Sequence, residues 1–76
     1  MAGMSLIDEV LARRLPAIRA RRAIRLSASV PQVRMAAELG VHRSTFIRWE
    51  NGIQEPRGDS AERYARLLAE LQRIAA

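Results

Sequence analysis

Apolar residues recur every three or four positions along most of the chain, which is the pattern of helices buried on one side. The longest such run lies at the C-terminal end, at Ala61, Tyr64, Ala65, Leu67, Leu68, Leu71 and Ile74. It predicts a helix over about residues 59–75, with Asp59 at the N-cap and Glu62 three residues later. No segment has the character of a strand, so the pattern predicts an all-α fold.

Two helices are predicted in the first third of the chain. Ser5 followed by Asp8 is typical of a helix start and predicts an extra N-terminal helix over about residues 5–15. Its apolar positions continue at helical spacing through Leu6, Ile7, Val10, Leu11, Leu15 and Ile18. Pro16 either begins the second helix or kinks the first, and that second helix extends to about Leu26.

Two short helices with a turn between them are predicted in the middle of the chain. Pro31 begins the first, and Gly40 ends it because glycine readily adopts the left-handed conformation of a helix C-terminus. His42 or Ser44 caps the second, which ends at Asn51-Gly52.

Length and composition fit one small domain over residues 1–76. The chain has no cysteine, and its single histidine, His42, lacks a second imidazole or a convergent pair of carboxylates. We therefore expect that the protein is not an enzyme and that it binds no metal ion, cofactor or small molecule. No apolar run approaches the ~18 residues that cross a bilayer, and the first twelve residues carry acids where a signal peptide carries basic residues. We expect a cytoplasmic protein that does not bind membranes.

Positive charge is concentrated in the first two thirds of the chain. All 13 basic residues are arginine, against 8 acidic ones, for a net charge of +5. Residues 1–48 hold nine arginines and three acids, and residues 49–76 hold four arginines and five acids. This balance favours an anionic partner. The arginines between Arg13 and Arg25 form either a solvated helical face or, in part, contacts to phosphate.

The two middle helices outline a helix-turn-helix over residues 31–52, in which the second helix enters the major groove of DNA. Ala36 is small where the two helices must cross closely, and Gly40 frees the turn between them. The apolar residues that fix the angle between the helices are Met35, Leu39, Val41, Phe46 and Trp49.

The segment Pro31–Gly52, PQVRMAAELGVHRSTFIRWENG, closely resembles the lambda-repressor-like family, the Cro and repressor type of helix-turn-helix. Glu55-Pro56 and the helix around Arg63–Leu68 are similar to that family's downstream part, so the resemblance covers about residues 20–71. It implies a compact all-α bundle of four to five helices. It also implies a sequence-specific regulator that binds double-stranded DNA, a repressor of phage or bacterial type.

The resemblance also implies roles for individual residues. The recognition helix extends over about residues 43–51, and the side chains at base edges are Arg43, Ser44 and Arg48, with His42 and Thr45 beside them. The resemblance places Gln32 and Asn51 at phosphates. We also expect Arg34 and Arg25 to contact phosphate. Gln32 either holds a phosphate or braces the recognition helix.

The chemistry of these side chains fits base reading independently of the family. The guanidinium fork of Arg43 and of Arg48 matches O6 and N7 of guanine. The alternative for both arginines is a solvated side chain or a phosphate contact. For His42 the chemistry favours a helix cap or a phosphate contact over base reading. Ile47 either touches a thymine methyl or extends the core.

Glu50 needs a cationic partner, because a free carboxylate among groove-facing residues would repel phosphate. The family resemblance points to an arginine in the upstream helix. Counting back from Gln32 without a gap selects Arg25, whereas an alignment on Leu26-Ser27 selects Arg22.

We expect a homodimer on a pseudo-palindromic site, because a module of this size makes few contacts by itself. Two apolar stripes compete for the interface, or else pack on each other within one chain. They are the N-terminal residues Leu6, Ile7, Val10 and Leu11, and the C-terminal residues Leu67, Leu71 and Ile74. The same stripes motivate a different function, a protein-interaction module such as an antitoxin or adaptor.

Overall fold

The computed structural model describes residues 6–7, 10 and 14–75, and the described residues form four helices and no strand. The helices are α2 (Ile18–Ser27), α3 (Gln32–Leu39), α4 (Arg43–Glu50) and α5 (Gly58–Ala75). The all-α prediction is confirmed, and each helix lies close to its predicted position. The predicted helix over about residues 5–15 falls largely outside the described residues.

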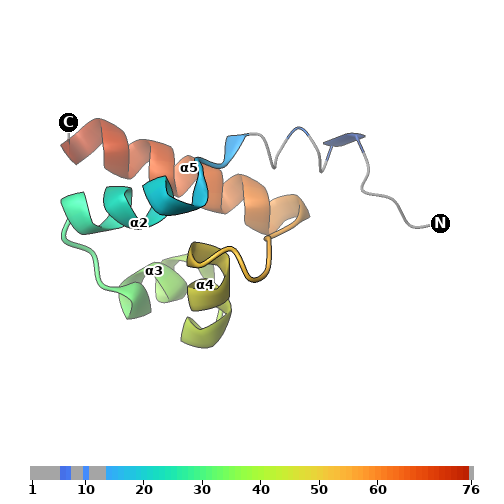
Figure 1. Cartoon of the computed structure of the whole chain (residues 1–76), viewed down its shortest axis with the longest axis horizontal. Coiled ribbons are helices and arrows are strands. Elements are labelled where there is room, and N and C mark those ends of the chain that lie inside the picture. Colours follow the sequence, from blue (N-terminus) through green and yellow to red (C-terminus); the bar gives the residue numbers. More distant parts are fainter. Residues whose placement is uncertain (1–5, 8–9, 11–13, 76) are drawn as a thin grey trace.

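The four helices form two pairs that face each other (Figure 1). In this view α2 lies along α5, and the shorter α3 and α4 lie together below them. α2 also contacts α4, and α3 also contacts α5, so the two pairs pack against each other. The helix-turn-helix formed by α3 and α4 therefore rests on a platform made by α2 and α5.

The turn between α3 and α4 has the geometry that the sequence predicts. Gly40 ends α3 in the left-handed region, at φ 69° and ψ 32°. The Val41 backbone N–H donates to the Ala36 carbonyl at 3.0 Å, and the Val41 side chain packs against the core. This closure reverses the chain between the two helices.

The predicted helix caps are only partly right. His42 is the N-cap of α4, but its side chain makes no capping hydrogen bond. Pro31 occupies the N-cap position of α3, one residue before the helix begins at Gln32. α5 begins at Gly58, so Asp59 lies in the first turn and not at the N-cap. There its charge still stabilises the positive end of the helix dipole.

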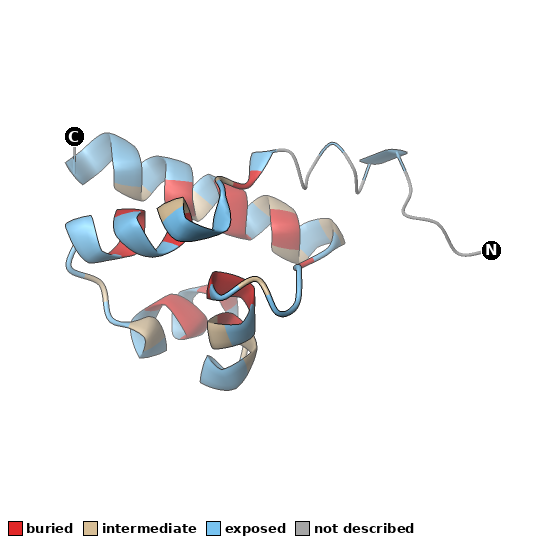
Figure 2. Ribbon diagram, viewed as in Figure 1, coloured by how far each residue is buried: buried red, intermediate tan, exposed pale blue. Residues whose placement is uncertain are grey.

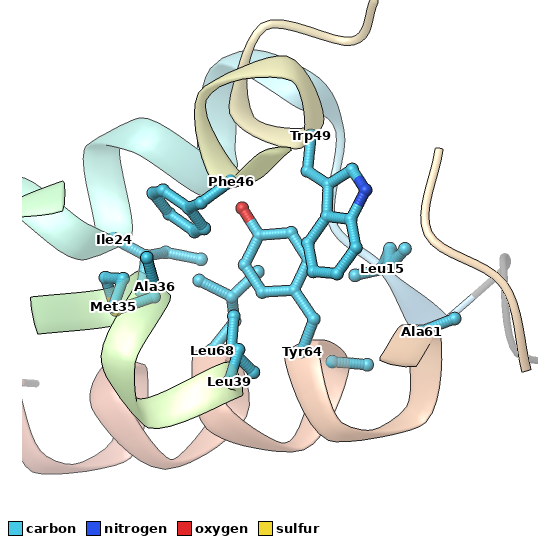
Figure 3. Close-up of a cluster of buried hydrophobic side chains, with 11 residues drawn as sticks. Leu15, Ile24, Met35, Ala36, Leu39, Phe46, Trp49, Ala61, Tyr64 and Leu68 are labelled. Atoms are coloured by element: carbon cyan, nitrogen blue, oxygen red, sulfur yellow. The ribbon is translucent and has the colours of Figure 1, made fainter. Parts of the chain in front are cut away.

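The core is built from buried residues of all four described helices (Figure 2). Tyr64 of α5 lies at its centre, next to two aromatic residues of α4 (Figure 3). Its ring meets Phe46 edge-on at a centroid distance of 5.6 Å and stacks on Trp49 at 5.8 Å. α5 is therefore joined to α4 mainly by aromatic packing.

The two apolar stripes do not cover each other in the described residues. Leu67 and Leu71 pack against the core, whereas Ile74 is exposed. Leu6 and Ile7 are 68% and 66% exposed, Val10 is also exposed, and Leu11 lies outside the described residues. Most of the C-terminal stripe thus belongs to the core of one chain, and the exposed apolar residues at both ends are left for other contacts.

Replacing Tyr64 by phenylalanine tests the packing at the centre of the core. The Tyr64 hydroxyl is buried and has no hydrogen-bond partner among the described residues. Such a group costs about 1–3 kcal/mol, and its removal with the ring kept is neutral or stabilising. We expect Tyr64→Phe to keep or raise the free energy of unfolding in urea, and Tyr64→Ala to lower it by about 3–5 kcal/mol. A loss above ~1 kcal/mol in Tyr64→Phe would contradict this account.

The same residue predicts a loss of stability in alkali. Burial, and after it the negative charge of Glu50, raises the pKa of the Tyr64 phenol above its ordinary value of 10.0. The folded protein therefore keeps this proton where the unfolded chain releases it, so the free energy of unfolding falls as the pH rises above about 10. Urea titrations between about pH 8 and 11 should show this decline in the wild type and a weaker one in Tyr64→Phe. Equal slopes would exclude Tyr64 as its source.

Candidate DNA interface

One side of α4 is buried and the other is open to solvent. Phe46, Trp49 and Glu50 face the interior. The outer side carries residues spaced by one helical turn, and we call it the outer stripe: Arg43, Ser44, Ile47, Arg48 and Asn51. Ile47 is half-buried in the middle of this stripe, and its other four residues are exposed. The stripe offers two guanidinium groups, a hydroxyl and an amide to a partner.

The position of α4 depends on a buried ion pair between α2 and α4. Arg25 binds the Glu50 carboxylate through two bonds, Nε to Oε2 at 2.6 Å and Nη2 to Oε1 at 3.0 Å. Its Nη1 also donates to the Val30 carbonyl at 2.9 Å. Arg25 is 6% exposed and Glu50 is 2% exposed. Arg25 is thus confirmed as the partner of Glu50, and Arg22 is not.

Gln32 links α3 to the same carboxylate. Its side-chain Nε2 donates to Glu50 Oε1 at 2.9 Å. Glu50 therefore accepts hydrogen bonds from α2 and α3 while it belongs to α4, and we call Arg25, Gln32 and Glu50 the Glu50 network. The bracing role predicted for Gln32 is observed.

A second buried arginine, Arg21, supports the end of α4. Its Nε donates to the Pro16 carbonyl at 2.9 Å, and its Nη1 donates to the Trp49 carbonyl at 3.0 Å. Nη1 also forms an ion pair with Glu55 at 3.1 Å. The sequence analysis missed this role. Its only signal is the spacing of Arg21 and Arg25, which places both on one face of the same helix.

The residues predicted to contact DNA lie in three different surroundings. The exposed ones are His42, Arg43, Ser44, Arg48, Asn51 and Arg34, whereas Thr45 and Gln32 are half-buried. Arg34 forms a surface ion pair with Glu38 at 3.4 Å. Arg25 is the exception, because its guanidinium is buried against Glu50 and Val30. This burial argues against the predicted phosphate contact of Arg25, and we leave it out of the proposed DNA contacts.

The outer stripe has a positive charge that nearby acids do not cancel. Glu50, the last residue of α4, is bound by Arg25, and Glu55 in the loop that follows α4 is bound by Arg21. Arg43 and Arg48 form no ion pair with another described residue. The two buried arginines thus neutralise the local carboxylates and leave the exposed arginines free for an external anion.

The described residues contain no group of three His, Cys, Asp or Glu side chains that could hold a metal ion. None of their helices combines the length and the apolar character that crossing a bilayer requires.

Comparison with known families supports the geometric description. The family model described as helix-turn-helix, of the lambda-repressor type, matches residues 22–71, close to the predicted range. Comparison with curated proteins and with solved structures gave no significant match. The matched range contains α3 and α4 completely, α2 without its first four residues and α5 without its last four.

Replacing Arg25 by methionine tests the buried pair. The change leaves the Glu50 carboxylate buried without a cation, which should lower the free energy of unfolding by roughly 3–5 kcal/mol. Arg22→Met removes the same charge from an exposed position of the same helix and should change it by less than about 0.5 kcal/mol. Urea denaturation of both variants compares the two candidate partners directly. Equal losses would contradict the assignment of Arg25.

Proposed function

Since the chain belongs to the helix-turn-helix family of DNA-binding regulators, we propose that it is a sequence-specific repressor of phage or bacterial type. It reads the major groove of double-stranded DNA with α4. The observation that carries this proposal is the outer stripe, in which Arg43, Ser44 and Arg48 are exposed on one side of a helix whose other side is anchored in the core.

Arginine side chains are the main readers in this proposal. Each guanidinium donates two parallel hydrogen bonds to O6 and N7 of guanine, so Arg43 and Arg48 select G within the site. Ser44 reads a neighbouring base edge, and His42 and Thr45 lie at the flanks of this surface. Ile47, half-buried in the middle of the stripe, contacts a thymine methyl group.

Polar residues around α4 hold the DNA backbone. Gln32 uses one N–H on Glu50 and has a second N–H for a phosphate. Asn51 is exposed at the C-terminal end of α4, where its side-chain amide donates a hydrogen bond to another phosphate. Arg34 exchanges its surface ion pair with Glu38 for a phosphate at little cost, because exposed ion pairs contribute only about 0–1 kcal/mol.

Two copies of the chain bind one site in this proposal. A single α4 of eight residues reaches few base pairs, and two-fold dimers read half-sites about 34 Å apart. The exposed apolar side chains at the two ends of the chain, among them Ile7 and Ile74, are available for the contact between copies. The operator is then a pseudo-palindrome.

Replacing the two readers tests the proposed function. A site is first selected from random DNA with the wild-type protein. Arg43→Ala and Arg48→Ala should each lose about 1–3 kcal/mol of discrimination between that site and a random duplex, because a bidentate contact to guanine is removed. Arg73→Ala removes the same charge from α5 and should keep the wild-type discrimination. Circular dichroism verifies that all three variants are folded.

Two results would overturn the proposal in different ways. Retention of wild-type discrimination in both reader variants would show that α4 does not read the bases. Absence of salt-sensitive binding of the wild type to any duplex would exclude DNA as the partner and favour a protein-interaction module on the same fold.

A further inference from the structure

Arg22 of α2 is an exposed arginine whose charge is not paired with an acid among the described residues. The Glu50 carboxylate is bound by Arg25, one turn further along the same helix. Arg22 itself forms no ion pair or side-chain hydrogen bond with the other described residues. Its guanidinium is therefore available to an external ligand.

A surface hollow lies beside this guanidinium, where α2 approaches the starts of α3 and α4. The residues that line it are Arg22, Arg25, Pro31, Gln32, Val33 and Arg43. None of these described residues is acidic, and Arg25 is already neutralised by Glu50. The free charges of the hollow are thus the two guanidinium groups of Arg22 and Arg43.

Other hollows on the molecule lack this imbalance. Three of those formed with α5 contain arginines, but each also contains a glutamate, namely Glu38, Glu62 or Glu70. Another, between α2 and α5, contains no charged residue. Two unpaired guanidinium groups around a space without a carboxylate favour an anion with several oxygens, since the planar fork of arginine matches phosphate.

We propose that this hollow binds a backbone phosphate of the DNA, with Arg22 as its principal donor. The inference rests on the proposed function and adds a contact from α2, outside the helix-turn-helix itself. When a recognition helix lies in the major groove, the helix before it crosses the DNA backbone. The start of that helix, at Pro31 and Gln32, forms part of the hollow.

Arg43 connects the hollow to the bases, because it belongs both to the hollow and to the outer stripe of α4. A phosphate held by Arg22 therefore limits how far α4 can move along the groove. In this role Arg22 positions the readers and does not select bases.

A matched pair of variants on α2 tests the proposal. Arg22→Ala and Arg19→Ala remove the same charge from exposed positions about one turn apart, but Arg19 does not line the hollow. Binding to the selected site and to a random duplex is measured over a range of salt concentrations. Arg22→Ala should weaken binding to both duplexes by about tenfold. It should also make the negative slope of log K against log salt less steep by about 0.9, whereas Arg19→Ala should keep the wild-type slope. Arg22→Gln should behave as Arg22→Ala.

Duplexes with single neutral methylphosphonates locate the contact. The wild type should lose about tenfold in affinity when one particular phosphate of each half-site is made neutral, and Arg22→Ala should lose nothing further at that phosphate. Inorganic phosphate should compete with DNA no better than chloride at equal ionic strength, because the anion is part of the duplex.

Each contrary result has a distinct meaning. Equal salt slopes for the wild type and the Arg22 variants, with wild-type affinity kept, would overturn the phosphate contact and leave the proposed function standing. Specific competition by inorganic phosphate, together with no methylphosphonate position that lowers the affinity of the wild type, would also overturn it, since the hollow would then hold a free anion only. A wild type that binds no duplex would overturn both the contact and the proposed function.

Discussion

The buried pair of Arg25 and Glu50 is the interaction on which the rest of the structure depends. It joins α2 to the helix that carries the exposed arginines, and Gln32 extends it to α3. Removing two charges from water has a large desolvation cost, which the two parallel bonds and the amide of Gln32 offset. The pair therefore fixes the orientation of α4 more than it adds to the free energy of unfolding, because its directional bonds permit few other arrangements.

The described arginines divide by burial into two classes with different roles. Arg21 and Arg25 lie inside, where they bind Glu55 and Glu50. They also donate to the carbonyls of Pro16, Val30 and Trp49. Arg43 and Arg48 lie outside and keep their charge. The buried arginines neutralise Glu50 and Glu55 and so keep the electrostatic potential around the exposed arginines positive. An unpaired Glu50 or Glu55 would weaken the attraction of a phosphate.

The helices and the outer stripe could be predicted from the sequence, because periodicity and Gly40 act locally. The partner of Glu50 could not be decided in the same way. Arg22 and Arg25 are three residues apart, so they lie on neighbouring parts of one helical face, and only the crossing of α2 over α4 selects between them. Arg21 was missed because a periodicity analysis assigns every arginine to the polar side. Burial of a charged residue depends on tertiary partners such as Trp49 and Glu55.

The shortness of α3 and α4 connects the fold to the proposed reading of DNA. Each has eight residues, well below the ~12–15 that an isolated helix needs in water, so both form only when docked on α2 and α5. Aromatic packing of Phe46 and Trp49 on Tyr64 holds α4 from one side, and the Glu50 network holds it near its C-terminal end. A substitution that removes the ring or the charge in either group, such as Tyr64→Ala or Arg25→Met, moves or melts the helix that carries Arg43 and Arg48. Loss of DNA binding after such a change reports on the orientation of α4, whereas loss with the fold intact reports on the contacts themselves.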